Sequence, residues 1–348
     1  MTGKRIRVML ADDSPFLCRM LSVHLVQAEG FEVVGCVHRG RSVLHKIREL
    51  RPDAVSLGLN FPDMDGLDVL AQVMTEHPVP VVVLTGTGGR FAFRIARAMD
   101  LGAVDYVLKF VPGQPIQPED LTRKIVSKLR LAAATKVVRL RAVSNTPMPR
   151  RPATRIAQDI VVIGASTGGP AALAELCSEI PAEFAPAVLV IQHMPARFTT
   201  SLAARLDRLC GIPVSEARRG DILFGSSVKV APGGFHLTLE PGGRIQLHAA
   251  ETSGAHCPSV DMAMESAAEV FGSHTVGVLL SGMGSDGVLG LAAIRNRHGL
   301  TYVQDPESCA VAGMPGAAIE QGVAGRVARP AELGRLLAKK TRGERHVS

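Results

Sequence analysis

A serine flanked by glycines follows an apolar run in the second half of the chain. Residues 160–163 are Ile-Val-Val-Ile, and Gly164, Ser166 and Gly168 form a Gly-x-Ser-x-Gly pattern. Glycine permits the strained backbone that turns a serine hydroxyl outward between a strand and a helix. A helix-compatible segment with Pro170 near its first turn comes next, and its N–H groups would face an oxyanion formed there. The pattern predicts a serine nucleophile for acyl transfer or hydrolysis.

A serine nucleophile needs a base and an acid that orients the base, and both residue types follow later apolar runs. His193 comes just after the run 187–191, and Asp286 lies in a glycine-rich loop after the run 275–280. Because parallel strands present their carboxyl ends at one edge of a sheet, we expect Ser166, His193 and Asp286 to meet there. The α/β-hydrolases carry these residues in the order Ser, Asp, His, so the order here predicts an unrelated fold with convergent geometry.

Each of these signals has a simpler interpretation. A glycine-rich turn between a strand and a helix often binds phosphate, which makes nucleotide binding at residues 164–169 one alternative. Against it, Ser166 stands where a dinucleotide fingerprint needs its second glycine. A single His after a strand is usually a loop or core residue, and a loop Asp usually forms a turn. Three such residues at three strand ends favour a catalytic set.

Five segments of the second half resemble the motifs of a known family. They are GASTGG at 164–169, QHMP at 192–195, HCPSVD at 256–261, SGMGSDG at 281–287 and GMPGAAI at 313–319. In this order they look like the motif series of the chemotaxis protein-glutamate methylesterases, over about residues 158–342. The family usually has Arg where this chain has Cys257, a departure that bears on substrate recognition. We expect Cys257 to be a passive small side chain and not a second nucleophile.

The resemblance implies a role for each candidate residue. Ser166 would be the nucleophile, His193 the general base and acid, and Asp286 the carboxylate that orients the histidine. Backbone N–H groups near Thr167 and Met283 would bind the oxyanion. Such enzymes hydrolyse γ-glutamyl methyl esters on the cytoplasmic helices of methyl-accepting chemotaxis receptors and release methanol in chemosensory adaptation. Many also deamidate receptor glutamines.

Composition fits a two-domain chain. The sequence has 348 residues, of which 46% are hydrophobic, and a formal net charge of +7. No apolar run approaches the roughly 20 residues that span a bilayer. The run 6–11 is too short for a signal peptide and leads into Asp12 and Asp13. The six cysteines are scattered without a Cys-x-x-Cys pair, so we expect a cytoplasmic protein without zinc, disulfides, other metals or cofactors.

The first part of the chain alternates apolar runs with helix-compatible segments. We expect strands at residues 6–10, 31–37, 54–59, 81–85 and 103–108. We expect helices at residues 15–28, at 42–50 and near 121–131. This alternation predicts an α/β fold with a flavodoxin-like, doubly wound parallel sheet. The second half predicts another doubly wound, mostly parallel α/β sheet.

The first part also resembles the receiver domain of two-component response regulators. The matching residues are Asp12, Asp13, Thr85, Lys109 and the Pro-x-Met-Asp-Gly loop at 62–66. In the family the acidic pair holds Mg²⁺, the threonine is the switch hydroxyl and the lysine pairs with the phosphoryl group. The position of the phosphate-accepting aspartate, four residues before Pro62, is occupied by Gly58.

Gly58 removes the carboxylate on which an aspartyl phosphate would form. The magnesium pocket also loses one of its three carboxylates, and Phe110 follows Lys109 where the family usually has Pro. We interpret the domain as a pseudo-receiver. The alternative is that Asp63 or Asp65 accepts phosphate, although both lie in the loop beyond the strand end.

A basic segment separates the two halves. Residues 123–155 hold ten Lys or Arg and no Asp or Glu. On the simplest interpretation this segment is a solvated linker. On another it is a docking element for an acidic receptor helix bundle. Nucleic-acid binding is less favoured, because no aromatic or helix-turn-helix signal accompanies the charge. The predicted domains are a receiver-like domain at 5–122, a linker at 123–157 and a catalytic domain at 158–342.

Two kinds of function fit this organisation. The favoured one is a serine methylesterase whose substrates are receptor helices, with a chemotaxis histidine kinase as a further candidate partner. The alternative is a binding or scaffold protein of a chemosensory pathway with residual esterase activity. The apparently complete triad favours the enzyme.

Overall fold

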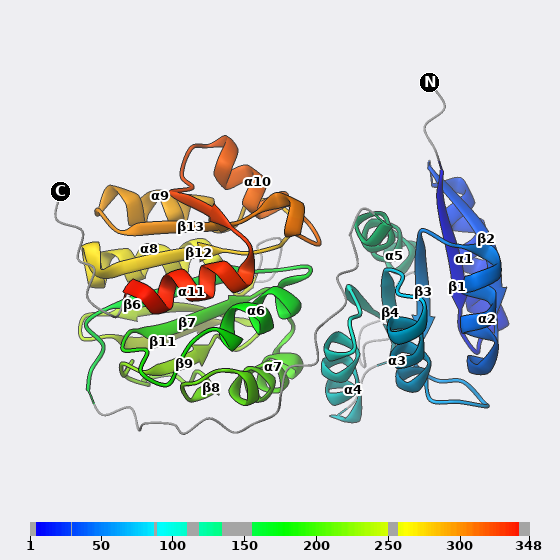
Figure 1. Ribbon diagram of the computed structural model, residues 1–348, viewed down its shortest axis with the longest axis horizontal. Coiled ribbons are helices and arrows are strands. Elements are labelled where there is room, and N and C mark those ends of the chain that lie inside the picture. The colour runs from blue at the N-terminus through cyan, green and yellow to red at the C-terminus, as the bar shows by residue number, and fades with distance from the viewer. Residues whose placement is uncertain are drawn as a thin grey trace. The chain divides into compact units, whose positions relative to one another are not determined.

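The computed structural model describes residues 5–28, 30–86, 89–109, 118–133, 155–249 and 257–340. By its internal contacts the chain divides into two units, residues 1–141 and 142–348, each of which has its own parallel sheet (Figure 1). Among the described residues no helix is both long and apolar enough to cross a membrane. The predicted α/β fold class is confirmed in both units.

The N-terminal unit is a five-stranded parallel sheet in the order β2-β1-β3-β4-β5. Its strands are β1 (Ile6–Ala11), β2 (Phe31–Val37), β3 (Ala54–Gly58), β4 (Val81–Thr85) and β5 (Asp105–Leu108). Its helices are α1 (Pro15–Gln27), α2 (Gly40–Leu50), α3 (Gly66–Glu76), α4 (Gly89–Asp100) and α5 (Pro118–Ala133). Helix α1 packs against α5, while α3 packs against both α2 and α4. This is the doubly wound arrangement that the alternation predicted.

Two boundaries in this unit differ from expectation for identifiable reasons. Strand β5 begins two residues later than predicted, because Gly102 is left-handed (φ 99°) and the Ala103 N–H still donates to Ala98 of the preceding helix (3.0 Å). Helix α5 begins earlier, at Pro118, where Glu119 and Asp120 follow in its first turn. Proline and acidic side chains both favour the start of a helix.

The C-terminal unit contains a seven-stranded sheet in the order β14-β13-β12-β6-β7-β9-β8, in which every pairing is parallel. Its strands are β6 (Ile160–Ala165), β7 (Ala187–Gln192), β8 (Val214–Glu216), β9 (Ser227–Val230), β12 (Thr275–Leu279), β13 (Leu300–Gln304) and β14 (Arg326–Ala328). An antiparallel hairpin adds β10 (Phe235–Glu240) and β11 (Arg244–Ala249).

Helices pack against this sheet in two groups. The α-helices are α6 (Gly169–Ser178), α7 (Ala196–Leu209), α8 (Val260–Phe271), α9 (Val288–Asn296), α10 (Gly313–Glu320) and α11 (Pro330–Lys340). Two short 3₁₀ turns, η1 (Gly272–His274) and η2 (Pro306–Ser308), flank β12 and β13. Helix α6 packs with α7 and α11, whereas α8 packs with α9 and β10.

The strand order reverses at β6, which positions the site. The chain adds β7, β8 and β9 on one side of β6, then places β12, β13 and β14 on the other. In such sheets a crevice opens at the carboxyl ends of the strands where the order reverses. Every residue of β6, β7 and β12 is buried, which explains why these strands are continuous apolar runs. A rigid core thus supports the three strand ends that carry the candidate residues.

Candidate active site

Ser166 follows β6 directly, at the turn into α6, as the glycine pattern predicted. Gly168 is the left-handed N-cap of α6 (φ 78°), a conformation that glycine adopts without steric cost. Gly164 faces Val260, and a Cβ at this position would overlap the Val260 side chain. The Ser166 N–H donates to the Ser281 carbonyl (3.0 Å). Gly168 therefore permits the turn, whereas Gly164 permits close packing against α8.

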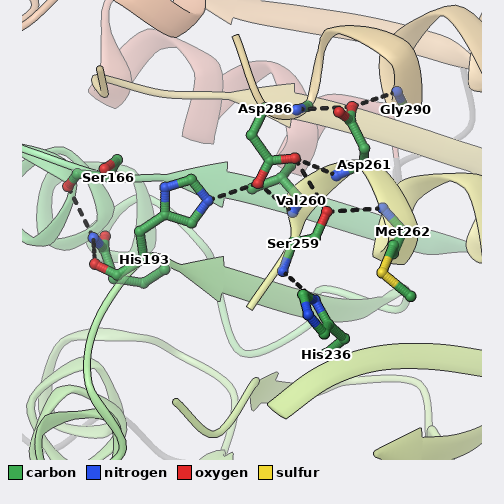
Figure 2. A network of polar contacts seen from close by, with 11 residues as sticks. Ser166, His193, His236, Ser259, Val260, Asp261, Met262, Asp286 and Gly290 are labelled. Carbon is green, nitrogen blue, oxygen red and sulfur yellow. Dashed lines mark hydrogen bonds and ion pairs between the residues drawn. The ribbon is translucent and has the colours of Figure 1, made fainter. Parts of the chain in front are cut away.

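His193 follows β7 and is held at both its backbone and its ring. Its N–H donates to the Ala165 carbonyl (2.9 Å), and its Nε2 lies 2.7 Å from Asp286 Oδ2. Only 9% of each of the two side chains is exposed. Figure 2 shows the imidazole between Ser166 and Asp286, with its second nitrogen turned to the serine side. The structure thus brings together the three strand-end residues singled out in the sequence.

Asp286 accepts three further hydrogen bonds at the start of α8. The donors are the N–H of Val260 (2.8 Å), the N–H of Asp261 (2.9 Å) and the hydroxyl of Ser259 (3.2 Å). Burial would raise the pKa of Asp286, but the hydrogen bond from His193 and those from the two N–H groups outweigh it and lower the pKa to about 2. Asp286 is therefore a carboxylate throughout the physiological range.

The ionised Asp286 fixes the tautomer of the histidine. A carboxylate can only accept, so His193 Nε2 carries the proton that bonds it. Nδ1 is buried and keeps a lone pair on the side of Ser166. The arrangement can remove a proton from the serine hydroxyl and stabilise the resulting imidazolium.

The loop after β12 passes directly beside the serine. A Cβ on Gly282 would lie 2.8 Å from Ser166 Cβ, so the backbone that leads into Met283 adjoins the nucleophile. Ser281 Oγ donates to the Thr167 carbonyl (2.8 Å), and Gln192 Nε2 donates to the Ser166 carbonyl (2.8 Å). These bonds hold the turn. The oxyanion role of the Thr167 and Met283 N–H groups stays a prediction.

Sequence reasoning missed how Asp286 is held. Ser259 is the N-cap of α8, and its hydroxyl accepts from the Met262 N–H (3.3 Å) while bonding Asp286. The signal was present, because Ser-Val-Asp before an apolar run is typical of a helix start. Cys257 lies just before this start, and burial raises the pKa of its thiol although the Gly234 N–H lowers it. A thiol with a raised pKa fits the expected passive role.

The receiver residues are also brought together in the N-terminal unit. Asp12 is buried and forms a short ion pair through Oδ2 with Lys109 Nζ. A Cβ on Gly58 would overlap that same Oδ2, so the aspartate occupies the space of the missing acceptor. Thr85 ends β4 and is buried, whereas Asp13 is exposed.

These receiver residues do not fit a magnesium site. Mg²⁺ needs several oxygen ligands in near-octahedral geometry, but Gly58 supplies none and the Asp12 carboxylate is engaged by an ammonium group. Among the residues that the structure describes, no three His, Cys, Asp or Glu side chains are grouped so that they could hold a metal.

The two alternative phosphate acceptors are committed elsewhere. Asp63 accepts from the N–H groups of Gly40 (2.8 Å) and Arg41 (3.3 Å) at the start of α2. Asp65 caps α3 and forms a two-pronged pair with Arg94 at 2.7 and 2.9 Å. Their geometry favours structural roles for both.

Part of the basic segment is structured. Lys128 pairs with Asp105 (2.7 Å), and Arg130 stacks over the Phe31 ring (5.2 Å). These two cations belong to the fold of the N-terminal unit and are not free for docking. Residues 134–154 of the expected linker lie outside the described residues.

Known proteins match both units. The family model of the CheB methylesterase matches residues 161–337, and that of the response regulator receiver domain matches residues 8–125. The chain belongs to the CheB methylesterase family. The protein-glutamate methylesterase/protein-glutamine glutaminase of Symbiobacterium thermophilum is 38% identical over 337 residues, covering 92% of this chain and 93% of that protein. The protein of the same name from Caldanaerobacter subterraneus is 38% identical and covers 97% of both chains.

A solved structure supports the assignment for the C-terminal unit. The CheB methylesterase catalytic domain of Thermotoga maritima matches with a TM-score of 0.50 and 38% identity, covering 52% of this chain and 98% of that one. The predicted family and the predicted fold are thereby confirmed.

Proposed function

We propose that this CheB-family chain hydrolyses γ-glutamyl methyl esters on the cytoplasmic helices of chemotaxis receptors and deamidates receptor glutamines. The observation that carries the proposal is the bonded pair of His193 and Asp286 beside Ser166, at the point where the strand order reverses. The names of the relatives support both reactions. The functional roles of the three residues are part of this proposal.

The bonded pair of His193 and Asp286 supports the following proton path. His193 Nδ1 takes the proton of Ser166 Oγ as that oxygen attacks the ester carbon, and Asp286 stabilises the imidazolium. The imidazolium then protonates the leaving oxygen, so that methanol departs and a γ-glutamyl ester of Ser166 remains. Water attacks this ester with His193 again as base, which frees the glutamate and the serine. With a glutamine substrate, ammonia leaves in place of methanol.

Backbone groups at the turn would stabilise the charge that develops on the carbonyl oxygen. We assign this role to the N–H groups of Thr167 and Met283, which flank Ser166 on the α6 side and the β12 side. The close approach of Gly282 to Ser166 supports the assignment. A donor of this kind typically contributes about 10²–10³ in kcat.

We assign the N-terminal unit to a receiver that does not accept a phosphoryl group. The Asp12–Lys109 ion pair in the space beside Gly58 supports this. The proposed boundaries are 5–122 for the receiver-like domain, 123–157 for the basic linker and 158–342 for the catalytic domain. A chemotaxis histidine kinase remains a candidate docking partner through this unit.

Methanol release from membranes that carry methylated receptors tests the function. We expect the purified chain to release methanol at a rate that Ser166→Ala abolishes. A scaffold protein with residual activity would instead bind the receptors without a burst of acyl-enzyme from an activated ester. Such a result would refute the enzymatic proposal.

A further inference from the structure

A second carboxylate, Asp261, exchanges backbone partners with Asp286. Asp261 lies in the first turn of α8, and its Oδ1 accepts from the N–H groups of Gly287 and Gly290, each at 2.8 Å. Those groups belong to the start of α9. Asp286, just before α9, accepts in return from Val260 and Asp261 at the start of α8. Each aspartate therefore caps the helix in the other's segment (Figure 2).

Helix α9 has no side-chain cap from its own N-cap residue. Its N-cap residue is Gly287, which has no side chain to accept from the first N–H groups of the helix. Asp261 supplies that acceptor from α8. A carboxylate is the side chain best suited to this place, because the N-terminal end of a helix carries partial positive charge.

The bonds of Asp261 join an exposed loop to a buried helix. Residues 283–285, which lead into Asp286, are exposed and include a glycine. Helix α8 is anchored in the core, where Val260 and Met264 are fully buried. Asp261 thus ties the Asp286 end of the loop to a helix that is anchored in the core.

The ionised form of the Asp261 carboxyl group is disfavoured at this position. Burial raises its pKa, and the charge of Asp286 adds to this, so the pKa is about 6 although the N–H groups of Gly290 and Gly287 lower it. Two adjacent, partly buried carboxylates repel each other, which costs stability. Carboxylates with shifted pKa values of this kind concentrate at functional sites.

We propose that Asp261 is a positioning residue of the esterase, which fixes Asp286 against α8 so that Asp286 can orient His193. It touches neither the substrate nor the reacting atoms. The inference rests on the proposed function of Ser166, His193 and Asp286.

Two damaging variants and one conservative variant test it, with methanol release from methylated receptors as the assay. Asp261→Ala removes the acceptor, and we expect kcat to fall about 10- to 100-fold, since a misplacement of about 1 Å costs about that much. KM should stay within about twofold, because substrate contacts are unchanged. Asp261→Glu keeps the charge but displaces it, so kcat should fall even if the alanine variant does not fold. Asp261→Asn keeps an oxygen for both N–H groups and should restore kcat to within about threefold.

A double-mutant cycle separates positioning from general stability. In an Asp286→Ala background, Asp261→Ala should change kcat by less than about twofold, because its effect passes through Asp286. Asp207→Ala is the matched control, since Asp207 accepts the Val214 N–H (2.8 Å) between α7 and β8. It should lower the urea midpoint without changing kcat.

Two results would overturn the proposal. One is a kcat within about twofold of wild type for both Asp261→Ala and Asp261→Glu. The other is an equal loss of kcat in the presence and absence of Asp286. Absence of any Ser166-dependent methanol release would instead refute the proposed function. In that event hydrolysis of p-nitrophenyl acetate through Ser166 still tests Asp261.

Discussion

The two units both place ionisable side chains beyond the carboxyl ends of parallel strands, but they hold them differently. In the C-terminal unit, Asp286 bonds His193 and the start of α8, and Ser166 is left at the turn beside them. In the N-terminal unit, Asp12 occupies the space beside Gly58 and pairs with Lys109. The Asp12 carboxylate and the Lys109 ammonium beside Gly58 neutralise each other.

This contrast has a physical cause. Charges that converge on a site are stable when backbone donors hold each of them separately, as the helix start holds Asp286. Asp12 accepts the Ser14 N–H at Oδ1 (3.1 Å), while its Oδ2 lies against the Lys109 ammonium and not against a backbone donor of a helix start. Burial raises the pKa of Asp12, and the Lys109 ammonium beside it acts in the opposite direction. The two groups form an ion pair beside Gly58, which supports the proposed pseudo-receiver.

The largest expected effect tests the complete site. Ser166→Ala should leave a folded protein whose methanol release falls by about 10⁴- to 10⁶-fold, as when triad members are removed from other serine hydrolases. Ser178→Ala, in the exposed last turn of α6, is the control and should retain full activity. Activity of the Ser166 variant within tenfold of wild type would end the assignment of the nucleophile.

The next prediction ranks the two partners of the serine. His193→Ala should cost about 10⁶ in kcat and Asp286→Asn about 10⁴, because only the histidine moves the proton. Asp286→Asn should also lower the free energy of unfolding. Its amide has one oxygen, so its NH₂ must face either the Val260 and His193 donors or the Asp261 and Ser259 donors. Purified variants compared at one pH and in urea check both statements, and a fully active Asp286→Asn would show that another carboxylate orients His193.

The third prediction concerns the incomplete site. Acetyl phosphate with Mg²⁺ should leave the intact mass of the wild-type chain unchanged and should not stimulate its esterase, because Gly58 offers no carboxylate. Gly58→Asp should permit labelling only if Asp12 leaves the space it occupies, and Asp12 Oδ2 is the end of a side chain that can rotate. A gain of about 80 daltons, the mass of one phosphoryl group, on wild-type Asp63 or Asp65 would contradict the pseudo-receiver.

Much of this architecture could be predicted from the sequence, because buried parallel strands are continuous apolar runs. Residues 160–165 and 187–192 form the central strands β6 and β7, and the polar residue after each one marked Ser166 and His193. Hydrogen bonds between residues far apart in the sequence were not predictable. Nothing local in the sequence shows that Asp261 accepts from Gly287, which lies 26 residues away. Likewise, Gly58 indicated that the acceptor carboxylate is missing, but not that Asp12 Oδ2 lies in the space that a side chain at this position would fill.

The smallest expected effect is a change with pH in the free energy of unfolding, which arises from the carboxyl group of Asp261. Its pKa is raised from 3.8 to about 6, so the folded chain binds this proton more tightly than the unfolded chain does. The stability that this proton confers is therefore complete below about pH 4 and is lost as the pH rises to about 6. Asp261→Asn has no such loss.

The free energy of unfolding of Asp261→Asn, minus that of wild type, should thus be flat below about pH 4 and rise towards about pH 7. Asp286 behaves oppositely, since its pKa of about 2 means that stability is lost only as the pH falls below about 4, and this contribution cancels in the difference. Urea unfolding at a series of pH values measures it, with Ser178→Ala as a control that adds or removes no titrating group. A difference that stays flat or falls over this range would mean that the Asp261 carboxylate is not held against Asp286 as the structure has it.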